Sequence, residues 1–123
     1  MQIQIRIADI TLTVTPRDTA TATAILAALP FESRAQTWGE EVYFKTPVDV
    51  DLEPDARDVV QAGELAFWIE GSCIAIGFGR TPISQGDEIR LAARTNIWAD
   101  TEDNVRQLKT IKTGDPIYID VLK

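Results

Sequence analysis

The sequence predicts a mainly β fold, in which about eight short strands form a closed barrel with two short helices. Apolar and polar residues alternate in several short segments, as they do in strands that bury one face. Turn-forming residues separate these segments at short intervals, which is typical of sandwiches and barrels. Closure into a barrel would also remove the exposed sheet edges that promote aggregation.

The N-terminal residues are expected to form a hairpin. Ile3, Ile5 and Ile7 alternate with polar residues, and the segment 10–14 repeats this alternation after a turn at Asp9. Each of the two strands would then bury one face.

A short helix is expected after Pro16. Asp18 or Thr19 can cap the segment 19–29, and Pro30 stops it. Threonine is a poor helix former, so packing of apolar side chains onto the barrel must hold this helix.

Two strands and an acidic loop are expected next. The strands lie near residues 31–36 and 41–45, with a turn at Trp38 and Gly39 between them. The acidic segment 49–58 alternates carboxylates as a calcium loop does, but it lacks the glycine at the sixth position and the distal glutamate. We interpret it as a solvated loop.

The segment 63–93 is expected to carry a hairpin and then a tight loop. Residues 65–70 and 73–78 are predicted strands, joined by a two-residue turn at Gly71 and Ser72.

The C-terminal third is expected to contain three more strands and a second helix. The strands lie near residues 88–91, 96–99 and 117–121. The helix would begin at Asp100 or Thr101, and two lysines would lie at its negative C-terminal end.

Composition limits the classes of function. The formal net charge is −7 and the basic residues are scattered along the chain. Nucleic acids and anionic membranes require a concentrated positive surface, so neither partner is expected. The chain has no histidine, which removes the commonest general base and zinc ligand, and no metal or cofactor is expected.

Length, hydropathy and cysteine content predict one cytoplasmic domain over residues 1–123. No apolar run approaches the length needed to cross a bilayer, and an alternating strand follows Met1 where a leader peptide would be basic and then apolar. Cys73 is the single cysteine, so no internal disulfide forms. A nucleophilic role would require an activating base, so we interpret Cys73 as a small buried residue.

Three sequence blocks occur in an order that is typical of one protein family. They are WGEEVYF (38–44), GELAFW (63–68) and IAIGFGRTPIS followed by GDEIR (74–90). With the hairpin, barrel and helices, they resemble the small bacterial and archaeal cyclophilin-like family over most of the chain. The resemblance implies a cyclophilin-type closed β-barrel with two helices.

The same resemblance implies little about activity. The prolyl isomerase site of true cyclophilins uses a Phe-His-Arg segment and a Gln- and Gly-rich segment, and neither occurs here. No active-site residue is therefore carried over, and isomerase activity stays an analogy of fold.

Strand parity places one set of candidate binding residues outside the barrel. Glu41, Tyr43 and Trp68 lie opposite to the aliphatic residues of their strands, and Arg90 is expected to join them. With Arg80 they would line a shallow groove for a peptide or a small anionic molecule. The alternative is that loops or helices simply cover the aromatic residues.

The loop at residues 77–82 is the second candidate surface. Its two glycines allow a tight turn, Pro82 stiffens its far side, and Arg80 would direct its donors at a carboxylate or carbonyl. Phe78 and Thr81 are the other candidate binding residues. The alternative is a turn in which the glycines serve backbone geometry alone.

Two functions therefore stay open, and enzyme activity is undecided. The first is a peptide- or protein-binding barrel with at most weak peptidyl-prolyl isomerase activity, in which Arg80 or Arg90 favours the twisted amide. The second is a small-molecule enzyme or sensor, in which Glu41 is an acid or base tuned by burial. An enclosed cavity favours the second function, and a shallow groove favours the first. A third possibility is that the same face is an oligomer interface.

Overall fold

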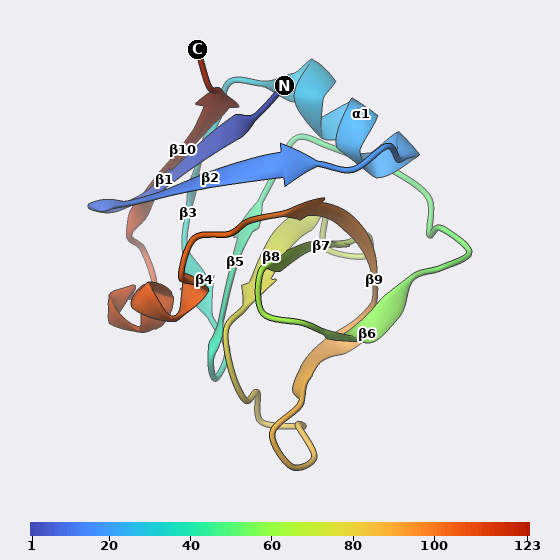
Figure 1. Cartoon of the computed structure of the whole chain (residues 1–123), viewed down its shortest axis with the longest axis vertical. Coiled ribbons are helices and arrows are strands. Elements are labelled where there is room, and N and C mark those ends of the chain that lie inside the picture. Colours follow the sequence, from blue (N-terminus) through green and yellow to red (C-terminus); the bar gives the residue numbers. More distant parts are fainter.

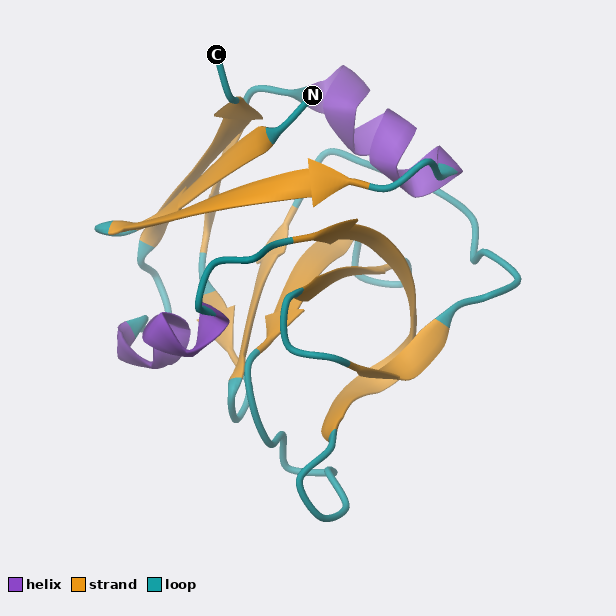
Figure 2. Ribbon diagram, in the orientation of Figure 1, coloured by secondary structure: helices purple, strands orange, loops and turns teal.

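Ten strands and two short helices build the protein, and the computed structural model describes all residues, 1–123 (Figure 1). The strands are β1 (Ile3–Ile7), β2 (Ile10–Pro16), β3 (Phe31–Arg34), β4 (Gln36–Thr37), β5 (Glu41–Lys45), β6 (Arg57–Val60), β7 (Glu64–Trp68), β8 (Cys73–Gly77), β9 (Ile89–Asp100) and β10 (Pro116–Val121). The helices are α1 (Ala20–Ala28) and the 3-10 helix η1 (Val105–Thr110). The predicted mainly β fold with two short helices is confirmed, as Figure 2 shows.

One antiparallel sheet forms a nearly closed barrel. The strand order is β3-β10-β1-β2-β9-β7-β8-β5-β4, and β6 pairs with β9 beside this path. Strands β3 and β4 lie at the two ends of this order, yet only Ala35 separates them in the chain. Beside this break, the Ser33 hydroxyl donates to the Lys45 carbonyl of β5 at 2.7 Å. The continuous chain therefore closes the barrel where the strand pairing stops.

The barrel interior is the main hydrophobic core, as the alternating pattern predicted. Alternate residues of the strands point inward, and α1 covers one end with Ile25 fully buried (Figure 2). The Thr19 hydroxyl caps α1 by accepting the Ala22 N–H at 3.1 Å. Central members of this core are Ile5, Leu12, Phe44, Phe67, Ile76 and Trp98. No helix in the structure has both the length and the apolar character needed to cross a membrane.

The last two residues of the predicted acidic loop begin a strand, and a buried polar network holds the rest of the loop in place. Residues 57–60 form β6, which the charged sequence around them did not indicate. Asn96 accepts the Glu53 N–H at 2.8 Å and donates to the Thr21 hydroxyl at 2.9 Å. The Thr21 hydroxyl in turn donates to the Glu53 carboxylate at 2.5 Å. These partners lie far apart in sequence, so a local pattern could not predict them.

Four predicted boundaries differ from the structure. The strand expected near residues 31–36 is divided at Ala35 into β3 and β4. The segments 88–91 and 96–99 belong to one strand, β9, because the residues between them bulge and do not turn. The β7–β8 hairpin has a four-residue turn over residues 69–72, since Trp68 and Cys73 are its last pair. The second helix is a single 3-10 segment that begins later, with Asn104 as its cap.

A second, smaller core covers the outer face of β5, β7 and β8. Strand β6 and the first half of β9 curve over this face (Figure 1). Gly77 of β8 makes the close approach possible, because a Cβ atom there would lie 2.4 Å from Ile89 Cγ2. The side chains that form this core are Val60, Ala66, Ala75, Ile89, Leu91 and Ile97, with Tyr43 packed against them.

Candidate functional site

A cavity of about 290 Å³ lies between the outer face of β5, β7 and β8 and the strand β9. Seven of its nine lining residues are hydrophobic, so water inside it gains few hydrogen-bonding partners. The lining residues are Trp38, Glu41, Tyr43, Trp68, Ala75, Leu91, Ala92, Ala93 and Thr95.

A bulge in β9 creates the space for this cavity. Arg57 pairs with Thr95 and Val59 pairs with Arg90, so β6 advances two residues while β9 advances five. The extra residues of β9 leave the regular ladder, as residues in a bulge do. They supply one wall of the cavity, Leu91, Ala92 and Ala93.

Two aromatic rings at right angles form the opposite wall. The ring centroids of Tyr43 and Trp68 are 6.4 Å apart, and the ring planes meet at 87°. Strand β8 lies between their strands, and its small Ala75 leaves room above the sheet for both rings. The edge-to-face arrangement is one that aromatic pairs prefer.

Gly71 fixes where the Trp68 ring lies. A Cβ atom at position 71 would be 2.2 Å from Trp68 Cζ3 and 2.4 Å from Cε3, so the indole packs directly on the glycine. The four-residue turn thus positions one wall of the cavity.

Replacing Gly71 by Ala is therefore expected to push the Trp68 ring out of its place over the turn. We expect a loss of about 1 kcal/mol in the free energy of unfolding, at the low end of the cost of overpacking. Unfolding by urea and the tryptophan fluorescence spectrum would measure both effects. The control is Gly114→Ala. The φ of +96° makes an alanine there strained, but a Cβ atom would meet no atom within 4 Å, so the strain stays within that turn. This control should therefore keep the wild-type spectrum, and an unchanged spectrum in Gly71→Ala would contradict the packing.

Glu41 is the only acidic residue in the cavity wall. Its side chain is 6% exposed, and its Oε1 atom is buried without a hydrogen-bond partner. The other buried atom that lacks a partner, Trp98 Nε1, belongs to the barrel core. Burial raises the pKa of Glu41 to about 7, because the ionised form loses hydration. A carboxyl group with this pKa exchanges its proton near neutral pH, as a general acid or base must.

Trp38 reaches the cavity through a turn that docks on a neighbouring loop. The Trp38 N–H donates to the Glu41 carbonyl at 3.1 Å, which closes the turn between β4 and β5. Gly39 has a φ of +58°, and a Cβ atom there would lie 2.9 Å from Thr81 Cα. The turn and the loop after β8 therefore support one another.

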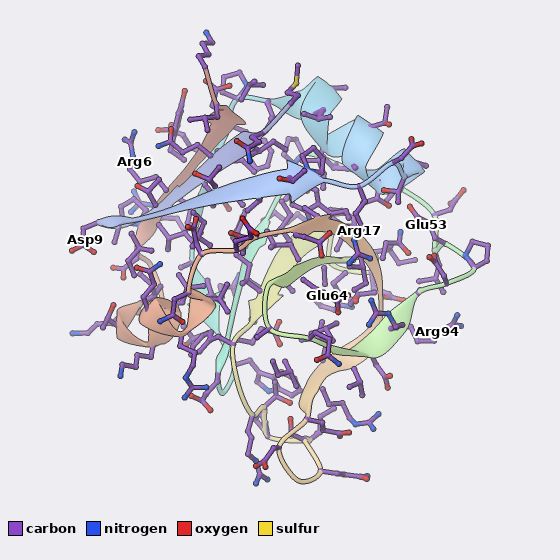
Figure 3. The ribbon with its side chains drawn as sticks, in the orientation of Figure 1. Arg6, Asp9, Arg17, Glu53, Glu64 and Arg94 are labelled. Carbon is purple, nitrogen blue, oxygen red and sulfur yellow. The ribbon has the colours of Figure 1, made fainter.

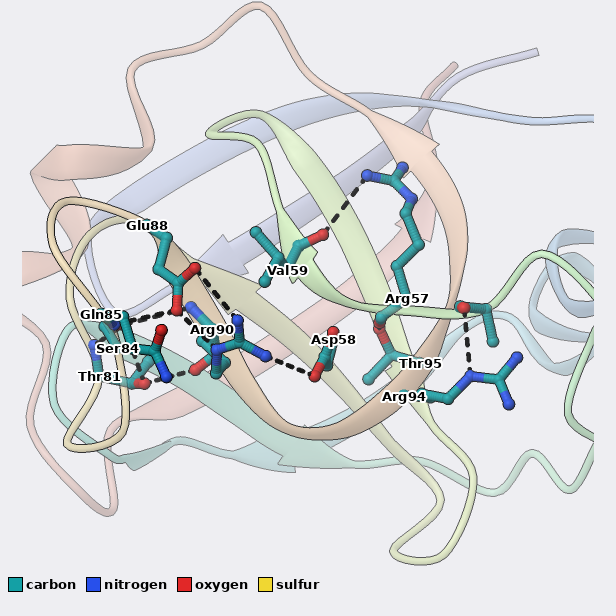
Figure 4. A network of polar contacts seen from close by, with 11 residues as sticks. Arg57, Asp58, Val59, Thr81, Ser84, Gln85, Glu88, Arg90, Arg94 and Thr95 are labelled. Atoms are coloured by element: carbon teal, nitrogen blue, oxygen red, sulfur yellow. Dashed lines mark hydrogen bonds and ion pairs between the residues drawn. The ribbon is translucent and has the colours of Figure 1, made fainter.

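The structure brings three of the seven predicted binding residues together, namely Glu41, Tyr43 and Trp68. Arg90 lies elsewhere, because its neighbours Ile89 and Leu91 face the second core, which places Arg90 on the opposite face of β9. Its guanidinium donates to Glu88 at 2.6 Å and to Asp58 at 2.8 Å (Figure 4).

The other three predicted residues belong to the loop after β8, away from the cavity lining. Arg80 is exposed, and its guanidinium donates to the Ser84 carbonyl at 3.4 Å. The Thr81 hydroxyl is buried and bonded to the Arg90 carbonyl (Figure 4). Phe78 is buried in the main core. The shallow groove that we expected from Arg80 and Arg90 with the aromatic residues is not formed by these side chains.

Sequence reasoning missed Trp38 and the whole β9 wall. Trp38 was detectable, since it lies within the same short turn as Glu41. The β9 residues carried no signal, because alanines and a threonine in a bulge resemble an ordinary connection.

Comparison with known proteins agrees with this architecture. A family model described as cyclophilin-like matches residues 1–120. The chain belongs to the cyclophilin-like family. The solution structure of a hypothetical protein from Archaeoglobus fulgidus is similar to this cyclophilin-like chain, at 34% sequence identity and a TM-score of 0.85. The alignment covers 99% of this chain and 95% of that chain. The search of curated proteins gave no match.

Proposed function

We propose that this cyclophilin-like protein binds a small, mostly apolar molecule in the cavity, with one polar group of that molecule bonded to Glu41. The observation that carries the proposal is the Glu41 carboxyl group, which lines the cavity and has no hydrogen-bond partner in the protein. An unsatisfied buried acceptor costs free energy, and a ligand donor would recover it.

The size and the lining of the cavity support a small ligand. Its volume of about 290 Å³ is close to the lower limit of common ligand sites, roughly 300–1,000 Å³. A mostly apolar lining with a few polar groups, here Glu41 and Thr95, is the usual composition of such sites. Glu41 also suits an enzyme or a sensor, because a carboxyl group with a pKa of about 7 changes its charge near neutral pH.

Peptide binding with weak prolyl isomerase activity is the second candidate. The right-angled pair of Tyr43 and Trp68 favours it, since two such rings can seat a proline ring. The arginines proposed to hold the twisted amide, Arg80 and Arg90, are bonded outside the cavity. We therefore give the small-molecule function first place.

The three tryptophan indole N–H signals provide the test. A fragment library and a panel of Xaa-Pro peptides would be added separately to ¹⁵N-labelled protein. We expect fragments to shift the signals of Trp38 and Trp68, which line the cavity, and to leave Trp98 in the barrel core unmoved. Exchange NMR on the same peptides measures isomerase activity.

Each result separates the two functions. Fragment-induced shifts without faster peptide exchange would support the small-molecule site. Faster cis–trans exchange, together with peptide-induced shifts of the Tyr43 backbone amide and the Trp68 indole signal, would favour prolyl isomerisation over the small-molecule function. Equal shifts of all three indoles would show a general change of the fold and would contradict a specific site.

A further inference from the structure

Resting on the proposed function, we propose that the ligand of the cavity is a protonated alkylamine. Such a cation keeps at least one N–H group and carries small apolar substituents on its nitrogen. The free carboxylate oxygen, the two aromatic faces and the charges around the cavity all favour it.

The free oxygen of Glu41 requires a donor. The carboxyl group lines the cavity without a hydrogen-bond partner, and the Trp38 N–H in the adjoining turn already donates to the Glu41 backbone carbonyl. A bond between an ammonium N–H and a carboxylate is assisted by charge and is about twice as strong as a neutral one. An amine therefore satisfies this atom better than an alcohol.

The aromatic wall suits the rest of the same cation. Tyr43 and Trp68 present two surfaces at 87° to one another, and Trp38 also lines the cavity. Cations are attracted to aromatic faces, and alkyl groups on the nitrogen reduce the cost of removing it from water. A quaternary ammonium would use these rings but would leave the Glu41 carboxylate without a hydrogen-bond donor.

No basic side chain neutralises Glu41 from within the cavity, because none is among its lining residues. Basic groups on the same strands are bonded elsewhere: Lys45 donates to the Gly71 carbonyl at 3.2 Å, and Arg94 donates to the Ala56 carbonyl at 3.4 Å. An anionic ligand would place a second negative charge beside an unpaired carboxylate, which is unfavourable. The net charge of −7 also attracts cations over anions.

Binding of the amine is expected to depend on pH through Glu41. The other titratable groups on this face of the sheet are Tyr43, Lys45, Cys73 and Glu64, which is bonded to Arg57 and Arg17. Burial raises the pKa of the Cys73 thiol so that it stays neutral. Glu41 must ionise to pair with the cation, and its pKa in the free protein is about 7. Affinity should therefore be constant between this pH and the pKa of the amine, fall about tenfold per unit below the first, and fall again where the amine loses its proton.

The test uses two probes of the same shape, N,N-dimethylethanolamine and 3-methyl-1-butanol. A protonated nitrogen in the first replaces a C–H carbon in the second. Calorimetric titration at pH 8 is expected to show that the amine binds at least about tenfold more tightly. At pH 5 this preference should be lost, while the affinity for the alcohol stays unchanged. Glu41→Gln should show no preference for the amine at either pH. Glu40→Gln should keep the preference at pH 8, because Glu40 accepts the Arg80 N–H outside the cavity.

The outcomes distinguish the alkylamine proposal from the small-molecule site on which it rests. A preference that depends on pH and on Glu41 supports the alkylamine. Equal affinities for the amine and the alcohol, with shifts of the Trp38 and Trp68 indoles, overturn the alkylamine and leave the small-molecule site intact. Absence of binding by both probes overturns the alkylamine, and only failure of the whole fragment library removes the site itself. A preference that survives in Glu41→Gln also overturns the assignment.

Discussion

Glu41→Gln is expected to make the protein more stable than the wild type at alkaline pH. Burial raises the pKa of Glu41 from 4.5 to about 7, so the folded protein binds this proton more tightly than the unfolded chain. The favourable contribution is complete below pH 4.5 and is lost as the pH rises through 7. The difference in the free energy of unfolding between variant and wild type should therefore change by about 3 kcal/mol across this range.

Urea unfolding at pH 4, 6, 8 and 9 would measure this difference. The direction in which the difference changes with pH is the decisive readout, because the buried amide of glutamine adds a cost that is the same at every pH. The matched control is Glu40→Gln, whose side chain is exposed and bonded at the surface, and its difference from the wild type should stay flat. Parallel stability curves for Glu41→Gln and the wild type would contradict the burial of this carboxyl group.

The instability that Glu41 causes is itself a reason to expect a ligand. A glutamine or an apolar residue at position 41 would remove the unpaired buried carboxylate, so folding alone gives no reason for a carboxyl group there. Stabilising substitutions at functional sites commonly cost activity for this reason. Binding at the cavity should recover the lost stability as the ligand concentration rises above its dissociation constant.

The face that carries the cavity could be predicted from the sequence because its signal is local. Glu41 and Tyr43 are two residues apart on one strand, and the period of two places them on the same side whatever the partner strands are. The aliphatic residue between them pointed to the barrel core, which identified the other side. Trp68 followed from the same reasoning on β7.

The remaining parts of the site depend on pairing over long distances. The bulge of β9 exists only relative to β6, and no single strand shows it. Arg80 was selected for its chemistry, and Arg90 was placed by its parity opposite Ile89 and Leu91. That placement was wrong, because Ile89 and Leu91 face the second core and not the barrel interior. Arg90 is held by Glu88 and Asp58, one close in sequence and the other 32 residues away.

Glu64→Gln is the second substitution with a large expected effect, and its pH dependence has the opposite sign. Glu64 accepts two hydrogen bonds from Arg57, at 3.1 and 2.7 Å, and one from Arg17 at 3.0 Å. Arg17, which lies beside Glu64 in Figure 3, is also bonded through two atoms to Asp100, at 2.7 Å each. The network therefore joins β6 and β7 to the ends of β2 and β9. The junction adjoins the cavity through Arg57, which pairs with the lining residue Thr95.

The network makes Glu64 a source of stability that acid removes. Burial alone would raise the pKa of Glu64, but the hydrogen bonds from Arg57, the Gln61 N–H and Arg17 outweigh it and lower the pKa to about 2. The contribution of the carboxylate is complete above pH 4.5 and is lost as the pH falls through 2. The full pKa shift corresponds to about 3 kcal/mol of folding stability at pH 7. Because both arginines are partly exposed, solvent screens these ion pairs, and we expect a contribution of about 2 kcal/mol.

Urea unfolding should show that Glu64→Gln is less stable than the wild type by about 2 kcal/mol at pH 7, with the difference closing near pH 2. The control is Glu88→Gln, which removes a carboxylate paired with Arg90 at the surface and should show a much smaller difference. A Glu64→Gln deficit that persists unchanged at pH 2 would mean that lost packing, not the charged bonds to the arginines, stabilises this junction.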